Sequence, residues 1–230
     1  MRRALVLLLL LCLPAAVAEA GPRVLVTGDS MVQPLDELLA KPVKRVDGRV
    51  KRDPRPGTAL TRPIVLDWEK HARKQAREHR PKATVMFIGA GDTEKLKSED
   101  GPRVACCSRA WVDAYSERVA RMMRSYMRKK RAYVYWLTLP APRQQKHQKR
   151  FLAINFAIAQ AAEEVGGKAR AVDTVPVLSP GNDFRRKLRY RGKMVVVRDG
   201  DGIHLTTAGS KIARDIVVRA MRADGLLEPR

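Results

Sequence analysis

The sequence has 230 residues, of which 46 are Lys or Arg and 24 are Asp or Glu, so its formal net charge at pH 7 is +22. So large a positive charge favours anionic surroundings, such as phosphate-bearing envelope polymers, acidic glycans or anionic lipid headgroups, although a surface adapted only for solubility would also carry it. No recognisable nucleic-acid-binding motif accompanies the charge, which argues against nucleic acid as a partner, and the length suits a single α/β domain with a full core.

The first twenty residues have the pattern of a secretory signal peptide. Arg2 and Arg3 precede an apolar segment over residues 4–13, and Ala18-Glu19-Ala20 forms a small-x-small cleavage site. The apolar segment is too short to favour a membrane-spanning helix, so no membrane span is expected in the mature chain. We therefore expect a mature chain that begins near Gly21 and works in the bacterial periplasm or outside the cell.

Hydrophobic patterning over residues 21–230 alternates between strands and helices. Strands are expected at residues 24–26, 43–50, 84–88, 131–139 and 169–178, and the apolar residues 194–197 lead into the last polar segment. Helices are expected at residues 35–40, 67–79, 111–130, 146–165 and 207–221, with polar loops at residues 51–63 and 93–108. This alternation predicts one domain, folded as a three-layer α/β/α sandwich with a mostly parallel central sheet, whose site lies at the carboxyl ends of the strands.

A candidate nucleophile and its partners stand at opposite ends of the chain. Ser30 follows the first strand in Gly28-Asp29-Ser30, where a tight turn would expose its hydroxyl beside the amides that open the next helix. The segment Asp199-Gly-Asp-Gly-Ile-His204 supplies Asp201 and His204 just before the last helix. A serine nucleophile needs a base to take its proton and a carboxylate to hold that base. Asp199 is either a solvated carboxylate or a substitute for Asp201, although the spacing favours Asp201.

Cysteines and the remaining histidines offer no further chemistry. Cys106 and Cys107 are adjacent and are either ordinary loop residues or oxidised to each other, since a bond between chains or a metal lacks a further ligand pair at a suitable spacing. His71, His79 and His147 lie in helical segments among charged residues and are expected to be solvated. We therefore expect no metal and no cofactor.

Three blocks of the sequence resemble the SGNH (GDSL-type) hydrolases. They are Gly28-Asp29-Ser30, the turn Gly89-Ala90-Gly91-Asp92 after a central strand, and the late segment that begins at Asp201 and includes His204-Leu-Thr. The match is best to a secreted bacterial branch that is catalogued largely as a domain of unknown function. Residues 60–63, 67–68 and 172–180 also look like that branch, so the likeness covers essentially the whole mature chain. It implies a flavodoxin-like SGNH hydrolase fold.

The resemblance also implies roles for individual residues. Ser30 would be the nucleophile and His204 the general base, while Asp201 would orient His204 and stabilise its imidazolium. The Ser30 amide would donate one hydrogen bond to the oxyanion, and a backbone amide between Gly57 and Ala59 would donate another.

The chain departs from the family pattern at the third oxyanion donor. The family has an Asn side chain there, whereas this sequence has Gly91 in Gly89-Ala90-Gly91-Asp92. Glycine has no side-chain donor, and the loss of one such donor typically lowers turnover about a hundredfold to a thousandfold. Asp92 itself is expected either to form the turn or to contact the site, and Asp29 is expected to accept hydrogen bonds from turn amides.

These features favour an extracytoplasmic serine esterase, or an O-acyltransferase that uses the same acyl-enzyme intermediate. Acetyl esters of an envelope polysaccharide or of peptidoglycan are the expected substrates, and the sequence leaves hydrolysis and transfer open. The alternative is a weak or inactive module of the same fold that binds anionic envelope polymers, which the basic residues 118–131 and 185–193 and the absent Asn would suit. A metal-dependent hydrolase comes third, because no ligand cluster has a suitable spacing.

Overall fold

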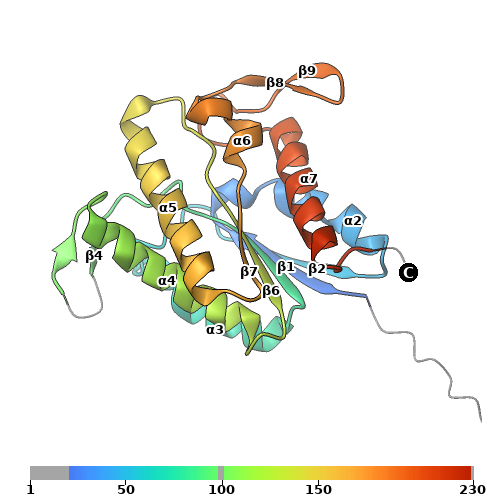
Figure 1. Ribbon diagram of the computed structural model, residues 1–230, viewed down its shortest axis with the longest axis horizontal. Helices are drawn as coiled ribbons and strands as arrows, with labels where there is room; N and C mark the ends of the chain where they lie inside the picture. The colour runs from blue at the N-terminus through green and yellow to red at the C-terminus, as the bar shows by residue number, and fades with distance from the viewer. Residues whose placement is uncertain (1–20, 98–100, 229–230) are drawn as a thin grey trace, which may run out of the picture.

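Five parallel strands form the central sheet in the order β2-β1-β3-β6-β7 (Figure 1). Their bounds are β1 (Arg23–Gly28), β2 (Arg49–Pro54), β3 (Ala83–Phe87), β6 (Tyr133–Leu137) and β7 (Ala169–Val172). The inner strands β1, β3 and β6 are almost entirely buried, as strands covered by helices on both faces must be. The chain runs from β1 outward to β2 and then crosses to β3 on the other side of β1, so the direction of winding reverses between β1 and β3.

Helices cover both faces of the sheet. The helices are α1 (Leu35–Leu38), α2 (Ala40–Lys44), α3 (Trp68–His79), α4 (Arg109–Met127), α5 (Gln148–Val165), α6 (Val175–Leu178) and α7 (Thr207–Ala223), with 3-10 turns η1 (Ser30–Val32), η2 (Gln145–His147) and η3 (Pro180–Asn182). Figure 1 shows α3, α4 and α5 together on one side of the sheet and α2 and α7 on the other, where α1 packs on α7. The predicted three-layer α/β/α sandwich with a parallel sheet is confirmed.

This computed structural model describes residues 21–97 and 101–228. The expected signal peptide, residues 1–20, lies outside the described residues. Among the helices of the described part, none is both long enough and apolar enough to cross a membrane.

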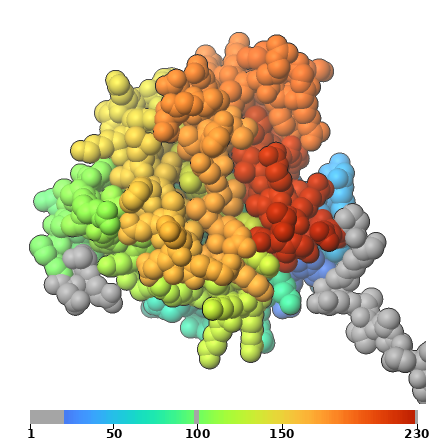
Figure 2. All heavy atoms as spheres, viewed as in Figure 1, coloured from blue at the N-terminus to red at the C-terminus, as the bar shows by residue number. Residues whose placement is uncertain are grey.

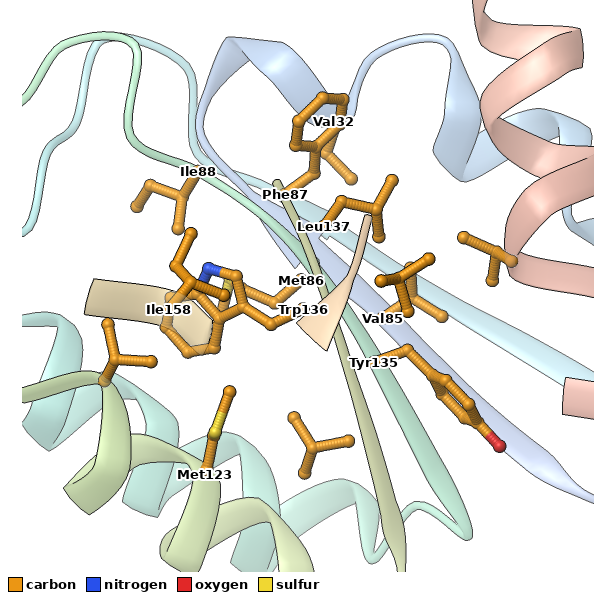
Figure 3. Packing of buried hydrophobic residues seen from close by; sticks show 14 of the residues in the cluster. Val32, Val85, Met86, Phe87, Ile88, Met123, Tyr135, Trp136, Leu137 and Ile158 are labelled. Atoms are coloured by element: carbon orange, nitrogen blue, oxygen red, sulfur yellow. The ribbon is translucent and has the colours of Figure 1, made fainter. Parts of the chain in front are cut away.

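The core lies between the sheet and its two helical layers. Side chains alternate along each strand, so Met86 and Trp136, which are paired across β3 and β6, point to the α4 and α5 side, where Met123 and Ile158 meet them (Figure 3). Leu137 points to the opposite face. All of these side chains are fully buried, and each such burial stabilises the fold by about 1.5–3 kcal/mol before the entropy cost is subtracted.

Two of the expected strands are wrong in part. Residues 40–44 form α2, and β2 begins only at Arg49 and runs through part of the expected loop to Pro54. The strand expected at residues 169–178 ends at Val172, and α6 follows it. The Asp173 side chain accepts a hydrogen bond from the Val175 amide, and Pro176 stands in the first turn, where it needs no donor, so this segment turns into a helix.

Two hairpins were not expected from the sequence. The first pairs β4 (Leu96–Lys97) with β5 (Arg103–Val104), and the second pairs β8 (Lys187–Tyr190) with β9 (Lys193–Val196). Positive φ angles at Arg191 and Gly192 close the second hairpin. In the space-filling view, the β8–β9 hairpin forms the top of the molecule above α7 (Figure 2). Cys106 and Cys107, which follow the first hairpin, form a disulfide bond with each other, one of the two states left open above.

A buried polar network joins β1 and β2 to the helices behind them. The Gln75 side chain donates to the Thr27 hydroxyl at 3.0 Å and to the Asp53 carboxylate at 2.7 Å, and it accepts from the Tyr126 hydroxyl at 2.6 Å. His71 also meets the Asp53 carboxylate, at 3.1 Å, so the expectation that His71 is solvated is wrong. Gln75 therefore satisfies polar groups from three different elements inside the core.

We predict that Gln75→Ala lowers the free energy of unfolding by about 2 kcal/mol, because buried hydroxyl and carboxylate groups lose their partner. Urea denaturation measures the effect. The matched control is Gln148→Ala, whose side chain bonds an exposed carbonyl and whose loss should cost less than about 0.5 kcal/mol. Equal stabilities of the two variants would contradict the prediction.

Candidate active site

The candidate site lies where the winding of the sheet reverses, at the carboxyl ends of β1 and β3. Ligand sites of open α/β sheets lie at such points. At the end of β1, a Cβ on Gly28 would lie 2.0 Å from the Phe87 carbonyl oxygen, and Gly28 has a φ of +151°, so only glycine fits there. Ser30 follows two residues later as the first residue of η1.

Asp29 ties the loop after β1 to the loop after β3. Its buried carboxylate accepts hydrogen bonds from the Met31 amide at 2.8 Å and from the Gly89 amide at 3.0 Å. Asp29 therefore accepts a hydrogen bond within its own turn, as the sequence indicates, and a second one from the loop after β3. Burial raises the pKa of Asp29 to about 6, although these amides counteract part of that effect.

Ser30, His204 and Asp201 form one hydrogen-bonded chain, although 174 positions separate the serine from the histidine. Ser30 Oγ lies 2.7 Å from His204 Nε2, and His204 Nδ1 is hydrogen-bonded to Asp201 Oδ2. Asp201 Oδ1 also accepts from the amides of Ile203, at 2.8 Å, and His204, at 3.0 Å. Burial raises the pKa of Asp201, but the hydrogen bonds from His204 and from the two amides outweigh it, so its pKa lies below its usual value. Such an arrangement can pass a proton from Ser30 to His204 while Asp201 holds the ring.

Arg198, which sequence reasoning missed, holds the turn that carries Asp201 and His204. It is fully buried, and its Nη2 donates to the Gly202 carbonyl at 3.2 Å and to the Ile203 carbonyl at 2.9 Å. Its guanidinium also lies over the Phe184 ring, 5.3 Å from the ring centroid. The available signal was an arginine directly after the apolar residues 194–197. An arginine there could equally have been solvated.

The segment after β2 borders the site. The Arg55 amide donates to the Gly28 carbonyl at 2.7 Å, which brings the following loop alongside the end of β1. In this loop Gly57 is exposed, with a φ of +77°, and the Ala59 side chain is buried. A Cβ on Gly91 would lie 3.4 Å from the Thr58 carbonyl oxygen. The structure therefore brings the predicted oxyanion segments, the Gly57 to Ala59 loop and Gly91, against each other.

Asp92 lies inside the protein rather than on the site surface. It is fully buried, and its two oxygens accept from the Thr61 amide at 2.6 Å and from the Tyr115 hydroxyl at 2.9 Å. Of the two roles left open for Asp92, the geometry favours the turn over contact with the site, since its amide donates to the Gly89 carbonyl at 3.1 Å and both carboxylate oxygens bind other parts of the chain. Burial raises the pKa of Asp92 to about 7, and the nearby Asp29 carboxylate adds to the shift.

In residues 21–97 and 101–228, no group of three or more His, Cys, Asp or Glu side chains could hold a metal ion. Within the same residues, the chain of Ser30, His204 and Asp201 is the arrangement that offers a nucleophile, a base and an orienting carboxylate.

The family model described as "Protein of unknown function (DUF459)" matches residues 23–220. Among curated proteins, no sequence matches this chain.

Solved structures of low sequence identity share the fold. A supposed SGNH hydrolase from Slackia heliotrinireducens is 19% identical with a TM-score of 0.59, over 87% of this chain and 99% of that one. A variant of an acetyl-xylooligosaccharide esterase from Geobacillus Stearmophilus is 14% identical with a TM-score of 0.55, over 87% and 94%. The periplasmic domain of a lipopolysaccharide acetyltransferase from Salmonella ser. Paratyphi A is 10% identical with a TM-score of 0.57, over 88% and 84%. The SGNH fold expected from the resemblance is confirmed.

The raised pKa of Asp92 predicts a fall in stability as pH rises. A folded-state pKa of about 7, above the ordinary value of 3.8, means that the folded chain holds a proton that the unfolded chain releases between these two values. The free energy of unfolding should therefore fall from pH about 4 to pH about 7. In Asp92→Asn this fall should be smaller, because the amide does not ionise.

Urea denaturation at a series of pH values measures the difference between the chain and its variant. Asp183→Asn, which makes the same substitution at an exposed position, provides the control for the exchange of a carboxylate for an amide. A steeper fall in Asp92→Asn than in the unmodified chain would contradict the argument.

Proposed function

We propose that this chain, which belongs to the family described as "Protein of unknown function (DUF459)", is a serine esterase or O-acyltransferase that works through an acyl-enzyme on Ser30. The observation that carries the proposal is the hydrogen-bonded chain from Ser30 through His204 to Asp201. An accessible serine hydroxyl, a ring nitrogen at 2.7 Å and a carboxylate on the other ring nitrogen meet the needs of nucleophilic acyl transfer.

In the proposed reaction, Ser30 Oγ attacks the ester carbonyl while His204 Nε2 takes its proton. Asp201 stabilises the imidazolium that results. The tetrahedral intermediate then expels the alcohol, which receives the proton from His204, and leaves the acyl group on Ser30. Water or another hydroxyl, which gives its proton to His204, next attacks the acyl-enzyme, and collapse of the second intermediate returns the proton to Ser30. Water gives hydrolysis, and a sugar hydroxyl gives transfer.

We further propose that the substrate is an acetyl ester of an anionic envelope glycan. The expected signal peptide supports a periplasmic or secreted location, and the formal charge of +22 suits an acidic polymer. Two of the structures that share the fold are named as an acetyl-xylooligosaccharide esterase and the periplasmic domain of a lipopolysaccharide acetyltransferase. Acetyl esters of polysaccharide or of peptidoglycan therefore make suitable first substrates.

The proposal predicts that Ser30→Ala lowers hydrolysis of p-nitrophenyl acetate at least about a thousandfold, because the nucleophile is lost while the fold remains. His204→Ala should have a similar effect. The matched control is Ser125→Ala, which removes a serine hydroxyl bonded within α4 and should leave turnover unchanged. If Ser30→Ala retains the turnover of the unmodified chain, Ser30 is not the nucleophile. Release of acetate against acetylation of an added oligosaccharide distinguishes hydrolysis from transfer.

A binding role for anionic envelope polymers is the second candidate, and two arginine-lined cavities favour it. One, of about 540 Å³, is lined by Arg73, Ala76, Arg77, Arg80, Ser125 and Arg128. The other, of about 480 Å³, is lined by Lys41, Pro42, Arg45, Arg191, Arg214, Asp215, Val218, Arg219 and Arg222. Burial, and then the nearby Arg80, Arg23 and Arg131, lower the pKa of Arg128, as expected where guanidinium groups lie close together.

The binding candidate predicts that a polyphosphate or an acidic polysaccharide binds with an affinity that falls at least about tenfold between about 50 and about 200 mM salt. The double variant Arg77→Gln with Arg80→Gln should weaken binding, because two of the cations that line the larger cavity are lost. Ser30→Ala should bind as the unmodified chain does, and so should Lys97→Gln, which removes an exposed cation from β4. Calorimetry measures all four proteins, and affinity that is independent of salt would contradict this role.

A further inference from the structure

The Arg62 guanidinium lies beside the position where a side chain at residue 91 would begin. A Cβ on Gly91 would be 3.2 Å from Arg62 Nη2, its nearest neighbour, and 3.7 Å from the Ala59 Cβ. A longer side chain at residue 91 would compete with the guanidinium for this space. The glycine and the arginine therefore form a complementary pair, in which the absence of one side chain leaves room for the other.

Arg62 is held in place, but within residues 21–97 and 101–228 some of its donors have no protein acceptor. Its amide donates to the Ala59 carbonyl at 3.2 Å, which fixes a turn, and its Nη2 donates to the Gly57 carbonyl at 3.3 Å. Its Nε is buried and has no hydrogen-bond partner in the described part of the chain. A guanidinium has five N–H donors, so most of those of Arg62 lack a protein acceptor there.

Four hydrogen bonds tie the Arg62 segment to the surroundings of Ser30. The Arg55 amide donates to the Gly28 carbonyl, and the Gly89 amide donates to Asp29, the residue before Ser30. On the other side, the Thr61 amide donates to Asp92 at 2.6 Å, and Asp92 in turn closes the turn by donating its amide to the Gly89 carbonyl. The loop that carries Arg62 and the turn that carries Gly91 thus border the serine at the same edge of the sheet.

We propose that Arg62 is a catalytic residue that donates a hydrogen bond to the oxyanion, the contribution that Gly91 cannot make with a side chain. This inference rests on the proposed function, because an oxyanion forms only when Ser30 attacks an ester carbonyl. A guanidinium is always charged, and a hydrogen bond in which a partner is ionised is about twice as strong as one between two neutral groups. The site therefore has a charged donor where the resemblance expects an asparagine.

The test uses kinetics with an activated acetyl ester. In Arg62→Met, which keeps much of the side chain's length and removes the donors, kcat should fall about a hundredfold with little change in KM, because the interaction forms only as the charge develops. The kcat of Arg62→Lys should lie between that of the unmodified chain and that of Arg62→Met, since lysine keeps the charge and loses the planar guanidinium.

Substitution of Gly91 separates a donor role from a packing role. Gly91→Asn alone should not raise turnover, because its Cβ already meets Arg62 Nη2 at 3.2 Å. Arg62→Ala empties the space beside residue 91. The double variant Arg62→Ala with Gly91→Asn should therefore have a kcat at least about tenfold higher than that of Arg62→Ala alone. A merely structural role for Arg62 would not be rescued by an amide at another position. Thermal unfolding of each variant shows whether it is folded.

Ser30→Ala and Arg109→Ala complete the set. Arg109 is an exposed arginine paired with Asp113, and its loss should leave kcat unchanged. If Ser30→Ala is inactive while Arg62→Met and Arg62→Lys keep kcat within about threefold, the inference is overturned and the proposed function stands. If no folded protein shows turnover that depends on Ser30, the inference and the proposed function are both overturned.

A second measurement follows the reaction of Ser30 with diethyl p-nitrophenyl phosphate by the intact mass of the protein. The rate of this reaction should be lower in Arg62→Met than in the unmodified chain, and an unchanged rate would also overturn the inference.

Discussion

Two buried carboxylates, Asp29 and Asp92, hold together the edge of the sheet where Ser30 lies. Asp29 binds amides from its own loop and from the loop after β3, and Asp92 binds the loop after β2 and α4. Without these bonds the amides of three loops would be unsatisfied inside the protein, where water cannot replace the lost acceptor. Their raised pKa values are the electrostatic cost of this arrangement. The placement of Ser30 depends on this arrangement, because the serine follows Asp29 directly.

Arginine has several distinct roles in this protein. Arg198 is buried and supports the turn with Asp201 and His204 through backbone carbonyls. Arg62 fills the space beside Gly91. In the two basic cavities, by contrast, arginines lie near one another at the surface. The net charge of +22 is therefore the sum of structural, proposed catalytic and proposed binding contributions, and no single role follows from the charge alone.

Elements that depend on local sequence patterns were predicted from the sequence, whereas elements that depend on particular contacts were not. Burial of β3 follows from a continuous apolar run, and the start of α3 follows from Asp67, whose side chain caps the helix. Residues 175–178 were misassigned because Val and Leu suit a strand as well as a helix, and the Asp173 hydrogen bond decided for the helix. Likewise β2 is an edge strand rich in charge, and its pairing with β1 sets its bounds.

By itself, the sequence determined the α/β class, the alternation of the main elements and the identity of Ser30, Asp201 and His204 as candidate partners, because these depend on local patterns and on residue type. Only the tertiary structure decided that Asp92 is internal, that Arg198 supports the turn with Asp201 and His204, and that Arg62 lies against Gly91. Each of these three side chains contacts a segment that is distant in the chain, or contacts one of several neighbours that it could reach. Tertiary packing decides which of these contacts forms, because the local sequence around an aspartate or an arginine does not show whether its side chain is solvent-exposed or buried.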